Sequence, residues 1–187
     1  MSLAQRVKDI LLSPKQTWPK IAAEETDIPT LYTQYLMILA LVPAIAGFIG
    51  MSLIGFNNGG QTVLVPLLNG VSSMVISYVL SLAMVYAIAL LANRLAPNFS
   101  GEKNLVSALK LIAYSSTSGM IGGVFSLLPA LWPLGLLASI YSLYLLFTGI
   151  PVMMKSPPER ALSYTAVLLV SSLIASAVLG IISSIFR

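Results

Sequence analysis

Residues 28–93 read IPTLYTQYLMILALVPAIAGFIGMSLIGFNNGGQTVLVPLLNGVSSMVISYVLSLAMVYAIALLAN and contain no Asp, Glu, Lys or Arg. A helix that crosses a bilayer needs roughly 20 apolar residues, so this stretch alone is long enough for two crossings and a turn. Its Asn and Gly residues predict that the turn lies at residues 56–62. Because the core of a globular protein does not show such long apolar runs, the sequence indicates an integral membrane protein.

The composition of the whole chain supports this class. Of its 187 residues, 57% are hydrophobic and 9% are charged, whereas about a quarter of a soluble domain is charged. The second helix of the membrane domain either tilts or begins late, at Pro66, and Pro43 predicts a kink near the middle of the first. We predict an all-α integral membrane protein in which residues 1–27 form a cytoplasmic segment and residues 28–187 form a domain of five transmembrane helices, at about residues 31–55, 63–92, 105–128, 134–154 and 162–186.

The basic residues predict the orientation of these helices. With five crossings, nine of the ten Lys and Arg residues fall on one side of the membrane, and the other side has only Arg187. Basic residues are enriched in cytoplasmic loops, so we expect a cytoplasmic N-terminus and an outside C-terminus. The nine are Arg6, Lys8, Lys15, Lys20, Arg94, Lys103, Lys110, Lys155 and Arg160.

The N-terminal segment has an amphipathic pattern. Leu3, Val7, Ile10 and Leu11 fall on one helical face, and a second helix is predicted to start at Ser13. Tryptophan beside lysines is typical of a membrane interface. We therefore expect this segment to lie on the membrane surface, and the alternative is a helix pair that packs on the bundle. The predicted membrane-surface residues are Arg6, Lys8, Lys15, Trp18 and Lys20.

The sequence offers little for chemistry. It has no Cys and no His, which excludes disulfides, thiolate nucleophiles, histidine proton shuttles and the commonest metal ligand. In the predicted topology all six carboxylates are cytoplasmic. We therefore predict no catalytic residue, no cofactor, no metal site and no nucleic-acid partner. Lys110 lies little more than a turn inside the third crossing, and we interpret it as a lysine that snorkels to the headgroups.

Small residues recur at four-residue spacing in three of the predicted crossings, the first of which contains Ala46 and Gly50. Such stripes let helix backbones approach closely, either inside one bundle or across a homo-oligomer seam. The predicted packing residues are Ser115, Gly119 and Gly123 in the third crossing and Ser172, Ser176, Gly180 and Ser184 in the fifth. In the second crossing Asn69, Ser72, Ser73, Ser77 and Ser81 either line a polar path or hydrogen-bond to helices.

Four stretches give the chain a resemblance to a known family. They are residues 13–24 (SPKQTWPKIAAE), residues 31–35 (LYTQY), residues 113–116 (AYSS) with 127–129 (LLP), and residues 141–151 (YSLYLLFTGIP). In this order they resemble the Yip domain family of Ypt-interacting proteins, specifically its short bacterial members. The residues that carry the resemblance are Tyr32, Tyr114, Pro129, Tyr141, Gly149 and Pro151.

The resemblance implies a five-helix domain in a cell membrane, with a bacterial inner membrane as the expected location and a cytoplasmic N-terminus. Eukaryotic relatives associate with Rab-type GTPases and with other family members. Their Asp-Leu-Tyr-Gly-Pro motif is present here only as Leu31-Tyr32, their Gly-Tyr-Ser motif has Ala113 in place of glycine, and their long N-terminal domain is missing. We therefore expect no Rab-type partner. The expected partners are the lipid bilayer and other membrane proteins, or a second copy of the chain.

Two functional hypotheses follow from the sequence. The first is a non-enzymatic membrane scaffold or adaptor that organises protein partners or lipid. The second is a small transporter, channel or lipid-moving protein. A polar path lined by the serines and Asn69 would favour the second hypothesis, and a sealed apolar bundle would favour the first.

Overall fold

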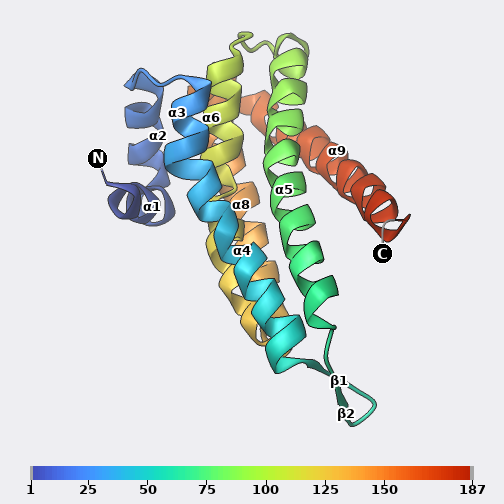
Figure 1. The fold of residues 1–187 in the computed structure, drawn as a ribbon. Coiled ribbons are helices and arrows are strands. Elements are labelled where there is room, and N and C mark those ends of the chain that lie inside the picture. The colour runs from blue at the N-terminus through green and yellow to red at the C-terminus, as the bar shows by residue number, and fades with distance from the viewer. Residues whose placement is uncertain (1, 186–187) are drawn as a thin grey trace.

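The computed structural model describes the backbone of residues 2–185 and the side chains of these residues except 58, 129 and 179–185. The fold is a bundle of helices built around α6 (Leu105–Ser115), as Figure 1 shows. Every residue from Ala108 to Ser115 is buried, so α6 is the central element. The other helices surround it and expose their apolar faces.

Four described helical segments are long and apolar enough to cross a membrane, and they confirm the prediction of an all-α membrane protein. They agree with the first, second, fourth and fifth predicted crossings. The first consists of α3 (Ile28–Leu31), a π-helical turn (Tyr32–Leu36), α4 (Met37–Ile49) and a second π-helical turn (Gly50–Ile54). The spans are Ile28–Ile54, Leu67–Phe99 (α5, Leu67–Leu95, with a 3-10 turn at Ala96–Phe99), Trp132–Met153 (α8) and Pro158–Val178 within α9 (Pro158–Ile185).

The third predicted crossing is a broken helix, which corrects the expectation of one continuous helix at residues 105–128. It consists of α6, α7 (Thr117–Gly122) and a 3-10 segment (Gly123–Leu127). At the break, the hydroxyls of Ser115 and Ser116 donate to the carbonyls of Leu111 and Ile112, both at 2.7 Å. Hydroxyls that bond back to the preceding turn bend helices. A short 3-10 turn (Pro129–Leu131) then leads into α8.

A β-hairpin replaces the simple turn predicted at residues 56–62. Strand β1 (Phe56–Asn58) pairs antiparallel with β2 (Gln61–Val63). Gly59 and Gly60 have φ values of 63° and 89°, the left-handed conformation that a two-residue hairpin turn requires. After the hairpin, α5 begins at Leu67, so the late start at Pro66 is confirmed. Asn69 consequently lies in the first turn of α5.

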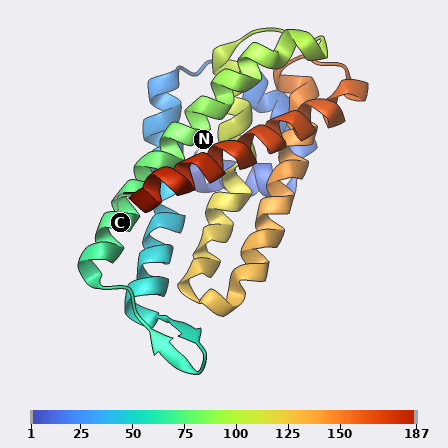
Figure 2. The same cartoon turned by 90° about the vertical axis from the view of Figure 1, so that its right-hand side faces the viewer.

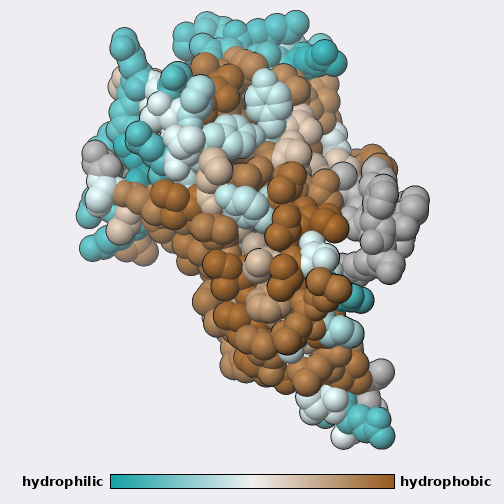
Figure 3. Space-filling view, viewed as in Figure 1, coloured by the Kyte–Doolittle hydropathy of each residue, from teal (hydrophilic) through white to brown (hydrophobic). Residues whose placement is uncertain are grey.

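The two ends of the bundle differ in polarity. We call the end with the β-hairpin the hairpin end, and the end with the α5–α6 and α8–α9 connections the charged end. At the charged end Lys155 and Glu102 form an ion pair at 2.7 Å, and the Ser156 hydroxyl donates to the carbonyl of Phe99 at 2.6 Å. Figure 3 shows hydrophilic surface at this end and over the N-terminal helices, and apolar surface over most of the rest. Helix α9 runs obliquely across its neighbours (Figure 2).

The N-terminal helices α1 (Leu3–Leu12) and α2 (Pro14–Ala23) pack on the side of the bundle (Figure 1). Ile10, Trp18 and Ile21 are each 0% exposed. The packed alternative is therefore what the structure shows, and the expectation that Trp18 rests on lipid is wrong. The apolar face of α1 and the side chain of Trp18 in α2 contact protein instead of lipid.

Side chains of the bundle hold the C-terminal ends of both helices. The Tyr141 hydroxyl donates to the carbonyl of Leu11 at 2.7 Å, and the Lys110 Nζ donates to the carbonyl of Ile21 at 3.1 Å and to that of Glu24. The last carbonyls of a helix lack partners inside the helix, and cations are favourable there. Lys110 therefore does not snorkel to the headgroups, because it is 5% exposed and bound to α2.

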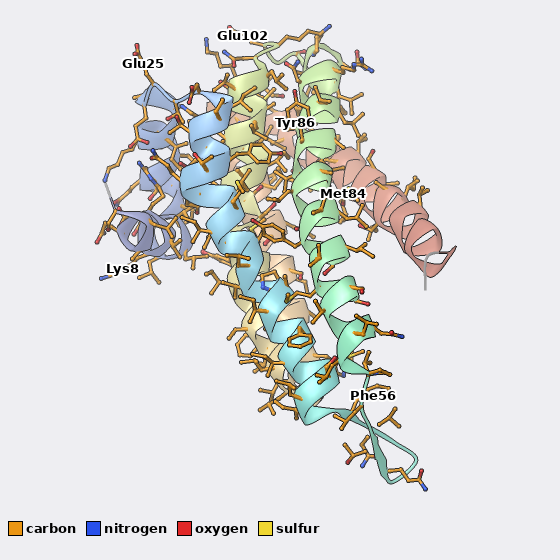
Figure 4. The ribbon with its side chains drawn as sticks, viewed as in Figure 1. Lys8, Glu25, Phe56, Met84, Tyr86 and Glu102 are labelled. Carbon is orange, nitrogen blue, oxygen red and sulfur yellow. The ribbon has the colours of Figure 1, made fainter. Side chains whose placement is uncertain are left out.

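Arg6 is also inside the protein rather than on a membrane surface. It is 7% exposed, forms an ion pair with Glu24, and lies over the ring of Tyr114 at 5.8 Å from the centroid. A buried arginine needs such partners because an unpaired buried charge is costly. Lys8, Lys15 and Lys20 are exposed, and Lys8 points away from the bundle (Figure 4). For these three lysines a membrane-surface role stays a prediction.

Candidate functional site

A groove of about 720 Å³ lies between α4 and α5. Binding sites for small molecules commonly have volumes of about 300–1,000 Å³, so this groove is large enough for one. Its apolar lining includes three methionines, Met51, Met74 and Met84. Its polar lining consists of Ser52 from the π-helical turn that follows α4, Asn69, Ser72, Ser73, Ser77 and Ser81 from α5, and Ser176 from α9.

Two glycines shape the groove. At Gly70 the helices are in contact, since a Cβ there would lie 2.0 Å from the Ser52 Oγ and 3.1 Å from the ring of Phe48. At Gly47 the space is open, since a Cβ there would have no atom within 4 Å. The two spans thus touch near the hairpin end and leave a space beside Gly47.

The groove extends deep into the bundle but does not continue along the whole of α5. The rise from Asn69 to Met84 is about 22 Å along an α-helix, which exceeds half of the roughly 30 Å hydrocarbon core of a bilayer. Met84 lies more than halfway along α5 (Figure 4). Beyond it, Val85, Ile88 and Ala89 are buried against other helices. This geometry suits a molecule held from the side better than a continuous pore.

Three of the six hydroxyls on the described groove wall bond to their own helix. Ser72, Ser77 and Ser81 donate to the carbonyls of Leu68, Met74 and Tyr78 at 2.9, 3.0 and 2.8 Å. Both roles considered for these serines are therefore present. They hydrogen-bond to their own helix, and they also line a polar surface. Ser52 differs, because its buried Oγ has no hydrogen-bond partner among the described residues.

The groove contains no Asp, Glu, Lys or Arg among its described lining residues. The polar groups of the described lining are hydroxyls and amides, which do not gain or lose a proton near neutral pH. The chemistry that the walls offer is apolar contact together with neutral hydrogen bonding. That combination fits an amphiphile of the bilayer.

A second, smaller cavity of about 180 Å³ lies deeper in the bundle, between α5, α6, α8 and α9. Met84 lines both spaces, so its side chain separates them. The polar residues of the smaller cavity are Ser115, Ser116, Ser142 and Ser172. The serine stripe of α9 thus faces both spaces, with Ser172 at one and Ser176 at the other.

The predicted packing residues divide into close contacts and cavity walls. Gly123 is a close contact, since a Cβ there would lie 2.5 Å from the Cβ of Pro43. Gly119 is looser; its N–H donates to the Ser142 Oγ at 2.9 Å, and a Cβ would lie 3.4 Å from that oxygen. Ser172 and Ser176 line cavities. The side chains at Gly180 and Ser184 lie outside the described residues.

Three other glycines make closer contacts, and of these only Gly50 was predicted from sequence, as part of a small-residue stripe with Ala46. A Cβ at Gly122 would lie 2.2 Å from the Cβ of Ala138, and one at Gly50 would lie 2.0 Å from the carbonyl oxygen of Ser126. Gly70 against Ser52 is the third. Gly50 follows Ala46 by four residues, and Gly122 lies four residues from both Ser118 and Ser126, so the same spacing could also have identified Gly122.

Three of the residues that carried the family resemblance contact the N-terminal helices. Tyr141 bonds to α1, Tyr114 lies under Arg6, and Gly149 leaves room for Trp18, since a Cβ there would lie 2.7 Å from the indole. Of the others, the Tyr32 hydroxyl donates to the carbonyl of Leu82 at 3.0 Å. Pro129 begins a 3-10 turn and Pro151 lies inside α8.

Comparison with known proteins places the chain among its relatives. A family model described as the Yip1 domain matches residues 8–180. "Inner membrane protein YohC" of Escherichia coli (strain K12) is 29% identical over 157 residues, which cover 82% of this chain and 80% of that protein. The protein of the same name from Escherichia coli O6:H1 (strain CFT073) gives the same values. No solved structure matches significantly.

Proposed function

This chain belongs to the Yip1 domain family, and from that premise we propose that it is a non-enzymatic scaffold of the bacterial inner membrane that binds a lipid between α4 and α5. The observation that carries the proposal is the groove of about 720 Å³. In a bilayer, lipid is the solvent around the spanning helices, so a laterally accessible groove meets lipid first. The inner-membrane location is supported by the relative named YohC.

Photochemical labelling tests lipid binding. The full chain is reconstituted into phospholipid vesicles with either a diacylglycerol or a phosphatidylethanolamine that bears a diazirine on the same acyl chain. We expect at least one probe to label peptides of residues 43–84, since these residues form most of the groove wall. Gly47→Leu should fill the open space beside Gly47 and reduce this labelling, measured by mass spectrometry.

The matched control is Ala83→Leu, which adds the same side chain at an exposed position of α5 outside the groove. It should leave labelling of residues 43–84 unchanged. Labelling by neither probe, or equal labelling in the Gly47→Leu protein, would refute lipid binding in the groove.

Movement of lipid between leaflets is a second candidate function. Met84 separates the groove from the smaller serine-lined cavity, so a change in its rotamer would join the two spaces. If the spaces join, the protein should accelerate transfer of a fluorescent lipid across vesicle bilayers, and Met84→Trp should abolish the acceleration. A rate equal to that of empty vesicles would exclude this function.

We propose a five-crossing topology, with the N-terminus in the cytoplasm and the C-terminus outside. The distribution of basic residues supports it. The chain has no cysteine, so single introduced cysteines report on accessibility without background. Cysteines at residues 27, 58, 100, 131, 157 and 187 should be labelled alternately from inside and outside, beginning inside. Labelling of residue 187 from the cytoplasm would contradict the five-crossing topology.

A further inference from the structure

The polar groups on the groove wall are uncharged, and no Asp, Glu, Lys or Arg is among the described residues that line it. The walls come from residues 43–84 and from Ser176. The sequence has no Asp, Glu, Lys or Arg between residues 28 and 93, or between residues 161 and 186. A phosphate group placed in this groove would lose water without gaining a cation, which is strongly unfavourable. The lining favours hydroxyl, ester or amide groups instead.

Ser52 provides a hydroxyl that lacks a partner. Its side chain is 5% exposed, and within the described residues its Oγ has no hydrogen-bond partner. The Oγ lies at the contact with Gly70, on the edge of the groove. Leaving a buried hydroxyl unpaired is unfavourable, so a ligand oxygen toward which the Ser52 hydroxyl rotates would stabilise the complex. Ser52 lies in the π-helical turn Gly50–Ile54, and such turns are frequent at functional sites.

Asn69 and the methionines complete the match to a lipid. Asn69 lies in the first turn of α5, so its amide is close to the hairpin end, where the headgroups of that leaflet would be. From there the groove continues toward Met84 between apolar side chains and the serines of α5, three of which already bond to their own helix. Methionine is flexible and adapts to irregular chains. A polar end near Ser52 and an acyl chain directed toward Met84 would therefore both find suitable partners.

We infer that the groove selects an uncharged diacyl lipid with a free hydroxyl, of the diacylglycerol type, over phospholipids. This inference rests on the proposed function and names the ligand class of the same groove. The free hydroxyl or an ester oxygen pairs with Ser52, and the absent phosphate removes the need for a cation.

Competition between matched probes tests the selectivity. The full chain in vesicles is irradiated with a diazirine-bearing diacylglycerol, or with the phosphatidic acid or phosphatidylethanolamine of the same acyl chains. We expect the diacylglycerol to label residues 43–84 most strongly. Ser52→Ala should lower this labelling by roughly two- to tenfold, the effect of one hydrogen bond on a binding constant. Ser139→Ala is the matched control, because the Ser139 hydroxyl bonds to the carbonyl of Gly135 in its own helix and Ser139 does not line the groove.

The outcomes separate this inference from the proposed function. Labelling of the groove by all three probes to the same extent, or most strongly by phosphatidic acid, overturns the selectivity and leaves lipid binding intact. Labelling by none of them overturns both. An equal loss of labelling with Ser52→Ala and Ser139→Ala overturns the role of Ser52. Equal melting temperatures for the two variants show that the comparison is between folded proteins.

Discussion

Replacing Trp18 by alanine should release the N-terminal helices from the bundle. The indole is 0% exposed and its Nε1 donates to the Thr148 hydroxyl at 3.2 Å. Truncating a buried tryptophan costs about 3–5 kcal/mol, which raises the population of the undocked segment by roughly 10²- to 10⁴-fold. Trypsin should then cleave the intact protein in detergent much faster after Lys15 and Lys20, as followed by mass spectrometry.

The second tryptophan provides the control for this experiment. Trp132 is 68% exposed, so Trp132→Ala should leave the cleavage rate unchanged. Gly149→Ala disturbs the same contact from the side of the bundle, because the new Cβ would displace the indole. It should increase tryptic cleavage at the same sites as Trp18→Ala does. Unchanged cleavage in both Trp18→Ala and Gly149→Ala would show that the segment is held by other contacts.

The second large effect is expected at Gly123, where the broken helix meets α4. A Cβ there would lie 2.5 Å from the Cβ of Pro43 and 2.8 Å from its Cα, and neither proline atom can move away independently. Overpacking of this kind costs about 1–3 kcal/mol. With roughly 2–4 °C for each kcal/mol in a chain of this size, Gly123→Leu should lower the melting temperature in detergent by several degrees.

Gly47→Leu is the control, since it adds the same side chain where no atom lies within 4 Å, and it should melt close to the wild-type temperature. Gly119→Leu should have a smaller effect than Gly123→Leu, because the Ser142 hydroxyl near it is a mobile side-chain group. An unchanged melting temperature for Gly123→Leu would show that α4 and the broken helix are not tightly packed. If Gly123→Leu instead leaves the melting temperature unchanged but removes a crosslinked oligomer band, the small-residue stripe of this crossing lies at a homo-oligomer seam.

The spanning helices could be predicted from sequence because their signal is local. A run such as residues 31–55 must be helical in lipid, where every backbone group needs a partner within its own segment. The β-hairpin was missed although Gly59 and Gly60 form its turn, since three-residue strands are too short to show alternation. The break at Ser116 was missed because serines inside apolar helices are common and bend only some of them.

The packing of Trp18 and the groove could not be read from sequence. A tryptophan beside Lys15 and Lys20 has the same local pattern whether it meets headgroups or protein, and Thr148 is 130 residues away. The serines of α5 were identified, but a groove depends on where α4 separates from α5. That separation is set by Gly47 and Gly70, and by the position of Ser52 on the facing helix.

The contacts of the N-terminal helices have a consequence for the order of events during synthesis. Trp18 and Leu11 each find their hydrogen-bond partner 130 residues further along the chain, at Thr148 and Tyr141. At about 5–20 residues per second, a ribosome needs roughly 6–26 s to make that length. During this time the N-terminal helices have left the ribosome and their docking surface is incomplete, since α8 has not yet been made. The first residues to be translated therefore wait for a late part of the chain before they reach their native neighbours.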